Sequence, residues 1–286
     1  FENPSLNESL FNVLEITNAS VDGVDLSSRV VVTGELVATA TPIINSDLLS
    51  LSGTAFVSQG NWNYDLVLDS HSGSWKLQQD QVVDKNFYLK STSLDLNGKI
   101  LTIKGNLIHS GGTLNVNGGT LIVDGNYRMQ TPTTDAEGNL TYTYGSGVLN
   151  MANALDKVLV RGDFVMNSNM SHRDKLIDGE LQVQGDFSQI TSFARRSCSA
   201  GRCVDVYTKD NFKPSGSHRV MLSGIVKQSV IFENPSLNES LFNVLEITNT
   251  SSEGVLFETG VVVFRLFEHN NNTVVFLNAI QMPDYD

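Results

Sequence analysis

Short stretches in which apolar and polar residues alternate recur along the chain, and each of them ends at a glycine. The clearest are ILTIKG (100–105) and TLIVDG (120–125). Alternation over four to six residues is typical of β-strands that bury one face. The same pattern returns in segments 48–53, 157–162, 180–185 and 219–224. The pattern therefore predicts an all-β protein.

The spacing of these strands indicates how they are stacked. Their glycines are Gly53, Gly105, Gly125, Gly162, Gly185 and Gly224, at intervals of 52, 20, 37, 23 and 39 residues. Corners at one or two multiples of about 20 residues fit the rungs of a solenoid, where each rung pairs with the next around a shared core. We therefore expect a right-handed parallel β-helix, or β-solenoid, with rungs of about 20 residues. A β-sandwich array is the alternative, and it favours hairpin turns every 8 to 12 residues.

The alternation also assigns the two faces of each strand and the role of the corners. Inward positions are Leu101, Ile103, Leu121, Val123, Leu159, Leu181 and Val183, and outward positions include Thr102, Ile122 and Gln182. We expect the corner glycines to adopt the positive φ that tight turns require. Asparagines recur beside the corners, at Asn97, Asn106, Asn115, Asn117 and Asn126. Their amides either stack from rung to rung as a ladder or act only as turn formers.

A long repeat surrounds this short one. The sequence FENPSLNESLFNVLEITN at 1–18 returns without a change at 232–249. Such self-similarity indicates an array of repeated structural units. We expect residues 1–231 to form one long-period solenoid repeat and 232–286 to begin a second copy, which diverges after Val263 into a candidate cap. The chain would then be a piece of a longer protein, with any secretion signal outside it.

The segment 215–249, together with LQVQGDF and LIVDGNY, resembles the repeats of large secreted bacterial surface proteins of the adhesin-like β-solenoid type. Similar repeats occur in extracellular regions of wall-associated and RHS-type proteins. The resemblance implies an extracellular or cell-surface rod, fibre or stalk with a structural or adhesive function. Its implied partners are neighbouring repeats, further copies of the chain, glycans or other cell-surface ligands. A carbohydrate-active β-helix enzyme or a glycan-binding module is the alternative.

Charge and motifs narrow the function classes. The chain has 31 acidic and 19 basic residues, a net charge of −12, and lacks the basic stripe that nucleic-acid binding needs. It also lacks an apolar run of about 18 residues, so we expect no membrane span.

The carboxylates Asp124, Asp163 and Asp186 adjoin corner glycines and could meet on neighbouring rungs as glycosidase sites require. Because sister rungs carry asparagine there, a solvated corner or ladder is favoured and no catalytic residue is predicted.

Two cysteines lie close together in SCSAGRC, at Cys198 and Cys203. A disulfide between them would close a six-residue loop, which the chain-entropy model values at about 2 kcal/mol. It would also indicate an oxidising compartment, as expected for a secreted protein. A pair of reduced thiols in a loop is the alternative.

The candidate binding residues are aromatic and acidic. Trp62, Tyr64 and Trp75 are candidates for stacking on sugar faces, with packing in an irregular rung as the alternative. Oxygen donors that could bind Ca²⁺ occur in the TDAEGN loop and at the end of the chain, namely Asp135, Glu137, Asn139, Asp284 and Asp286. Acidic loops are also commonly just solvated. No other cofactor is expected.

Overall fold

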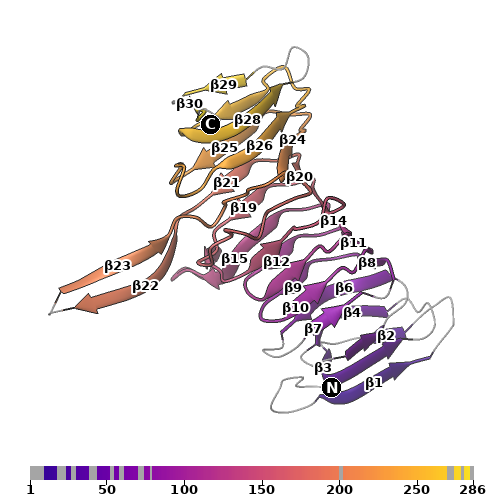
Figure 1. Ribbon diagram of the computed structural model, residues 1–286. Coiled ribbons are helices and arrows are strands. Elements are labelled where there is room, and N and C mark those ends of the chain that lie inside the picture. Colours follow the sequence, from indigo (N-terminus) through magenta and orange to yellow (C-terminus); the bar gives the residue numbers. More distant parts are fainter. Residues whose placement is uncertain are drawn as a thin grey trace.

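The protein is a β-solenoid of about nine turns with rungs of about 23 residues (Figure 1). The computed structural model describes residues 10–17, 24–26, 30–38, 44–51, 55–57, 61–69, 74–77, 79–199, 202–268, 274–277 and 280–283. These residues contain strands and turns but no helix. Successive rungs pair in parallel, and the described antiparallel pairs are confined to two hairpins. The predicted solenoid is therefore confirmed, and the β-sandwich alternative is wrong.

Each rung contributes strands to stacked parallel sheets. The first sheet contains β8 (Gln81–Val83), β11 (Ile100–Ile103), β14 (Thr120–Val123), β18 (Lys157–Val160), β20 (Glu180–Val183), β24 (Arg219–Leu222), β26 (Phe242–Ile247) and β28 (Val261–Glu268). The second contains β9 (Phe87–Leu89), β12 (Leu107–His109), β15 (Tyr127–Thr134), β19 (Phe164–Met166), β21 (Phe187–Gln189), β25 (Gln228–Phe232), β27 (Val255–Phe257) and β29 (Val274–Phe276). The third contains β7 (Ser74–Lys76), β10 (Ser93–Asp95), β13 (Thr113–Asn115) and β17 (Val148–Asn150).

The first turns of the solenoid consist of β1 (Phe11–Ile16), β2 (Val24–Leu26), β3 (Val30–Ala38), β4 (Ile44–Leu51), β5 (Ala55–Val57) and β6 (Asn61–Leu68). Here single long strands run through what later becomes two sheets, since β6 pairs with β8 near its start and with β9 near its end. At the other end of the chain, β30 (Ile280–Gln281) pairs in parallel with β28. The stack is thus continuous along the described chain.

The strand register reproduces the spacing of the corner glycines. Leu121 lies opposite Leu101, Val158 opposite Leu121, Leu181 opposite Val158 and Val220 opposite Leu181. The intervals of 37 and 39 residues each contain an inserted antiparallel hairpin. One joins β15 to β16 (Leu140–Tyr144), and the other joins β22 (Ser192–Ser199) to β23 (Arg202–Thr208). The hairpins lengthen two rungs and leave the stacking register unchanged.

The core consists of inward-facing side chains stacked in columns along the solenoid. Leu101, Leu121, Val158 and Leu181 are each at most 1% exposed. A second column is aromatic: the rings of Tyr127, Phe164 and Phe187 follow one another with 5.3 Å between successive centroids. Burying one such side chain stabilises the fold by roughly 1.5–3 kcal/mol.

The prediction that Leu159 points inward is wrong by one residue. Leu159 aligns with the outward residues Ile122 and Gln182, whereas its neighbours Val158 and Val160 are buried. The sequence KVLV is apolar at three consecutive positions, so its alternation is ambiguous. A slip of one residue exchanges the two faces of a strand.

The corner glycines are required for a different reason from the one expected. Gly105, Gly125, Gly162 and Gly185 stack on one another, and none has a positive φ. The N–H of Gly125 donates to the carbonyl of Gly105 at 3.0 Å, and a Cβ on Gly125 would lie 2.6 Å from that oxygen. Close approach of successive backbones therefore selects glycine. Positive φ occurs instead at the NGG corner, where Asn117 has φ 46° and Gly118 has φ 75°.

Where both copies of the repeated region are described, they form the same strands. Strands β1, β2 and β3 recur as β26, β27 and β28 at the 231-residue offset, and the pair Phe11–Val32 recurs as Phe242–Val263. Of the candidate cap, residues 270–272 lie outside the described residues. Strand β29 pairs in parallel with β27, so the stack continues beyond the point where the two copies diverge.

Candidate functional site

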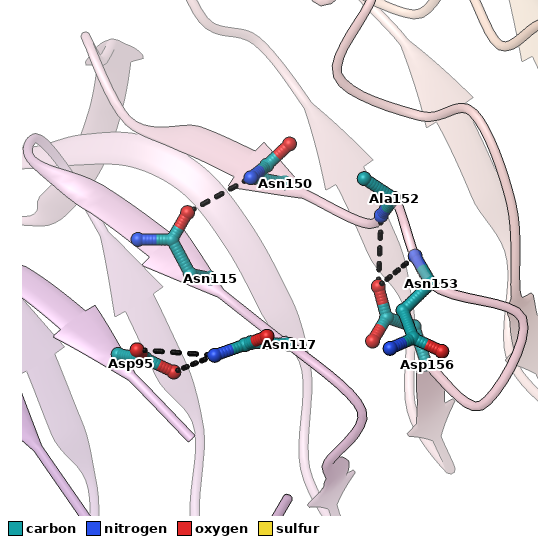
Figure 2. A pocket seen from close by; sticks show the side chains of 7 residues that line it. All are labelled: Asp95, Asn115, Asn117, Asn150, Ala152, Asn153 and Asp156. Atoms are coloured by element: carbon teal, nitrogen blue, oxygen red, sulfur yellow. Dashed lines mark hydrogen bonds between the residues drawn. The ribbon is translucent and has the colours of Figure 1, made fainter. Parts of the chain in front are cut away.

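A polar cavity of about 330 Å³ lies on the outer face of the third sheet (Figure 2). It is lined by Asp95, Asn115, Asn117, Asn150, Ala152, Asn153 and Asp156. Leu94, Leu114 and Leu149 are buried and aligned in register, so the residues that follow them point outward. The turn after β17 adds residues 152–156 as one wall.

Hydrogen bonds hold the side chains of the cavity in place. The Asn117 Nδ2 group donates to both oxygens of Asp95 at 3.0 and 3.2 Å, and that of Asn150 donates to Asn115 Oδ1 at 2.9 Å. Asp156 is only 1% exposed. Its Oδ2 accepts the N–H groups of Ala152 and Asn153, and its Oδ1 accepts the N–H of Gly118. Asp156 thus fixes the turn that forms the wall.

The cavity presents fixed amide and carboxylate groups without an aromatic ring. Its volume falls at the low end of the about 300–1,000 Å³ typical of small-molecule sites, but those sites are mostly apolar. Closely spaced donors and acceptors match a ligand rich in hydroxyl groups. Within the described residues, no group of three or more His, Cys, Asp or Glu side chains is placed to hold a metal ion. Binding of a polar organic molecule is the chemistry that this lining supports.

A ladder of side-chain oxygens runs along the glycine corner. Each oxygen accepts the backbone N–H of the matching residue one rung further on, at 2.7–3.1 Å. The ladder consists of Asp65, Asn86, Asn106, Asn126, Asp163, Asp186 and Ser229. The expected ladder is therefore present at Asn106 and Asn126, although its donors are mainly backbone N–H groups and, among the described residues, only the Asn106 amide donates to a neighbouring side chain of the ladder, Asn86. Asn117 does not belong to this ladder and donates to Asp95 instead.

The ladder accounts for two of the three carboxylates considered as glycosidase groups. Asp163 and Asp186 occupy the asparagine position of their rungs and accept N–H groups from the next. Asp124 lies on the other side of its corner glycine and pairs with Arg161. All three carboxylates are therefore engaged, two with backbone N–H groups of the next rung and one with an arginine.

The aromatic candidates occupy different environments. Trp75 is 2% exposed and packs among the core residues Leu77, Phe87 and Leu94. Ser74 and Lys76 take the outward positions of the strand, and Trp75 points inward. The Trp75 ring is therefore inaccessible to a ligand. Trp62 and Tyr64 belong to β6, and their side chains lie outside the described residues.

The candidate calcium ligands Asp135, Glu137 and Asn139 come together in the turn between β15 and β16. Asp135 Oδ1 accepts the N–H groups of Glu137 and Asn139 at 3.1 and 2.7 Å, and Oδ2 accepts the Asn139 amide at 3.1 Å. These hydrogen bonds lower the pKa of Asp135 below its usual value, and the bond from the Asn139 N–H has the largest effect. The groups that contact the Asp135 carboxylate are thus N–H hydrogen-bond donors and not further oxygen ligands for a cation. Asp284 and Asp286 lie outside the described residues, and calcium binding remains a prediction.

The predicted disulfide is present between Cys198 and Cys203. The two residues lie directly opposite each other in the β22–β23 hairpin, one pair away from Ser199 and Arg202, where the hairpin reverses. Their Cα atoms are 4.1 Å apart, as expected for a close antiparallel pair. The hairpin projects from the solenoid as a two-stranded extension, coloured orange in Figure 1. The disulfide therefore clamps an exposed tip.

Three histidines are fully buried in the solenoid, at His109, His172 and His218. His109 bonds the Tyr127 hydroxyl at 3.0 Å and the Gly112 carbonyl at 3.2 Å. His172 Nε2 accepts the Leu149 N–H, while Nδ1 lies 3.2 Å from the Met170 carbonyl. Neither ring nitrogen of His218 has a hydrogen-bond partner. Burial lowers the pKa of His109 and His218 to about 3 and that of His172 to about 4, so all three are neutral.

Sequence reasoning identified only part of the cavity. Asn115 and Asn117 were singled out as corner residues, whereas Asp95, Asn150, Asn153 and Asp156 were not. The available signal was the register, because Asp95 precedes Asn115 by one 20-residue rung. Asp156 lies in a longer turn between β17 and β18, so its position does not follow from the 20-residue spacing.

Fold and geometry together define the chain as a parallel β-solenoid with a polar cavity and a projecting hairpin. No protein-family model, no curated protein and no solved structure matches the chain. Among the described residues, there is no helix that is long and apolar enough to cross a membrane.

Proposed function

We propose that this chain is a non-catalytic rod segment of an extracellular bacterial surface protein, which holds adhesive surfaces at a distance from the cell. The carrying observation is the uninterrupted ladder from Asp65 to Ser229, which joins each rung to the next along one corner. Nine turns at about 4.8 Å per rung rise roughly 43 Å. A bonded stack of this kind suits a stiff spacer.

Two further observations support the extracellular location. The disulfide lies at an exposed hairpin tip, and disulfides persist mainly in oxidising compartments. The repeated segment forms the same strands 231 residues apart, so further copies would extend one rod. Both agree with the location implied by the resemblance to secreted surface repeats.

Antibodies raised against this chain provide the test. They should label intact, unpermeabilised cells of the producing bacterium, and mild protease treatment of those cells should remove the label. Labelling only after permeabilisation would overturn the proposal. The enzyme alternative predicts new reducing ends or unsaturated products when the protein is incubated with acidic and neutral polysaccharides.

Glycan binding in the polar cavity is a second candidate function. The amides of Asn117 and Asn150 and the carboxylate of Asp95 are already oriented by hydrogen bonds, which lowers the cost of ordering them around a sugar. Replacement of Asp95 by Asn keeps the shape of the cavity but removes its charge. On a glycan array, a sugar bound here should bind D95N about tenfold more weakly. The matched variant Asp174→Asn, an exposed residue outside the cavity, should bind normally.

A further inference from the structure

The β22–β23 hairpin, here called the arm (192–208), is a basic element on an acidic rod. It carries three arginines and one aspartate, whereas the whole chain has a net charge of −12. Arg196 pairs with Asp205 at 3.7 Å. Among the described residues, no carboxylate lies within ion-pair distance of Arg195 or Arg202. Two guanidinium groups of the arm therefore remain available to an anionic partner.

The length of the arm separates Arg202, which is paired with Ser199 at the tip, from the acidic solenoid, whereas Arg195 lies nearer the base. Strand β22 has eight residues, which at about 3.4 Å each reach roughly 27 Å. The Debye length at physiological ionic strength is about 8 Å. The negative field of the rod is therefore largely screened at the arm tip, where the disulfide holds the two strands together.

Aromatic rings lie where the arm leaves the solenoid. Phe193 lies between Tyr144 of β16 and Tyr207 of β23, with 6.1 Å between ring centroids on each side. Tyr144 and Tyr207 are 39% and 49% exposed, unlike the buried phenylalanines of the core. Nearby on the β15–β16 hairpin, the Arg128 guanidinium lies 5.2 Å from the Tyr142 ring centroid. The two hairpins thus form one row of accessible rings beside the basic arm.

We propose that the arm and this row of rings bind an acidic polysaccharide. In the arm, Arg202 and Val206, the partner of Arg195, alternate with Tyr207, so the two arginines lie on the opposite face from Tyr207. The polymer therefore passes around the arm: the tyrosine rings stack on sugar faces on one side, while Arg195 and Arg202 pair with carboxylate or sulfate groups on the other. The charge on the ligand has to be sparse, because two arginines are unpaired and the rod behind them is acidic. A polysaccharide with charges on some of its sugars fits this better than a nucleic acid, which has a phosphate on every nucleotide. The inference names a ligand class for the proposed adhesive role and rests on that role.

The probes are hyaluronate, unsulfated chondroitin and κ-carrageenan, which carry about one carboxylate or sulfate per two sugars, with uncharged dextran and oligo(dT) as comparisons, and binding is measured by biolayer interferometry at several salt concentrations. At least one acidic polysaccharide should bind, more weakly as salt rises, and dextran should not. The double variant Arg195→Glu, Arg202→Glu should weaken binding about 100-fold, at about tenfold per charged contact. Tyr207→Ser should weaken it about fivefold without changing the salt dependence.

The matched control is Lys227→Glu, an exposed charge reversal in a turn of the solenoid outside the arm, which should bind like the parent protein. No binding to any acidic polysaccharide, equal binding to oligo(dT), or parental binding by both arm variants would overturn the inference. Small-angle scattering and surface labelling do not depend on this ligand. An elongated, surface-exposed protein that binds none of the probes would therefore refute the ligand class and leave the proposed rod standing.

Discussion

Mild acid should destabilise this solenoid because its core contains three neutral histidines. Burial holds the pKa of His109 and His218 at about 3 and that of His172 at about 4, against 6.5 for an exposed histidine. The unfolded chain binds protons at these sites below about pH 6.5, whereas the folded chain does not until the pH approaches its lower values. Stability is therefore fully present above pH 6.5 and is lost as the pH falls.

The size of the effect follows from the pKa differences. Well below pH 6.5, each histidine lowers the free energy of unfolding by about 1.4 kcal/mol per pH unit, so between pH 7 and pH 5 each histidine costs roughly 2 kcal/mol and the three together about 6. Any folded-state pKa below about 4 gives nearly the same figure, since protonation of the unfolded chain sets the loss in this range. Carboxylates titrate mainly below pH 5, so they contribute little in this window.

Urea unfolding followed by circular dichroism at pH 7, 6 and 5 measures the loss. His218→Phe is the informative variant, since His218 has no hydrogen-bond partner and lies beside Phe212, with 6.4 Å between ring centroids. The variant should reduce the pH dependence by about one third and be more stable than the parent at pH 5. Equal stability of the parent at pH 7 and 5, or an unchanged pH dependence in the variant, would refute the reasoning.

Three further predictions concern the strand faces, the corner and the disulfide. Leu121→Asp should abolish folding or cost more than about 4 kcal/mol, whereas Thr102→Lys should cost less than about 1 kcal/mol; similar thermal midpoints would contradict the assigned faces. Gly125→Ala should cost about 1–3 kcal/mol in urea unfolding, because its Cβ would lie 2.6 Å from the Gly105 carbonyl, and unchanged stability would argue against close stacking. Cys198→Ser with Cys203→Ser should speed proteolysis within the arm and leave the melting of the solenoid unchanged; a lower solenoid midpoint would show that the arm supports the rod.

The sequence was most informative where one rule determined both the spacing and the chemistry. At the corner between the first and second sheets, four successive rungs read KGN, DGN, RGD and QGD (104–106, 124–126, 161–163 and 184–186). The glycine allows close stacking, and the following Asn or Asp supplies the ladder oxygen. Both demands recur at each rung, so the register could be predicted. The polar cavity could not, because Asp156 enters it only through one lengthened turn and acts on backbone groups of other segments.

The same constraint explains where the accessible surfaces lie. A longer connection at the glycine corner would break the stacked backbone bonds and the ladder together, so in four successive rungs it has three residues. Glycines also approach the preceding rung closely at the other two corners, at Gly111, Gly112 and Gly119, but among the described residues the combination with a ladder oxygen does not recur there over four successive rungs. Both hairpins follow a strand of the second sheet: the β15–β16 hairpin lies between β15 and β17 of the third sheet, and the β22–β23 hairpin lies between β21 and β24 of the first. The turn that forms the cavity wall lies between the third and first sheets. One corner therefore maintains the rod, while the other two accept the insertions on which ligand contacts can be built.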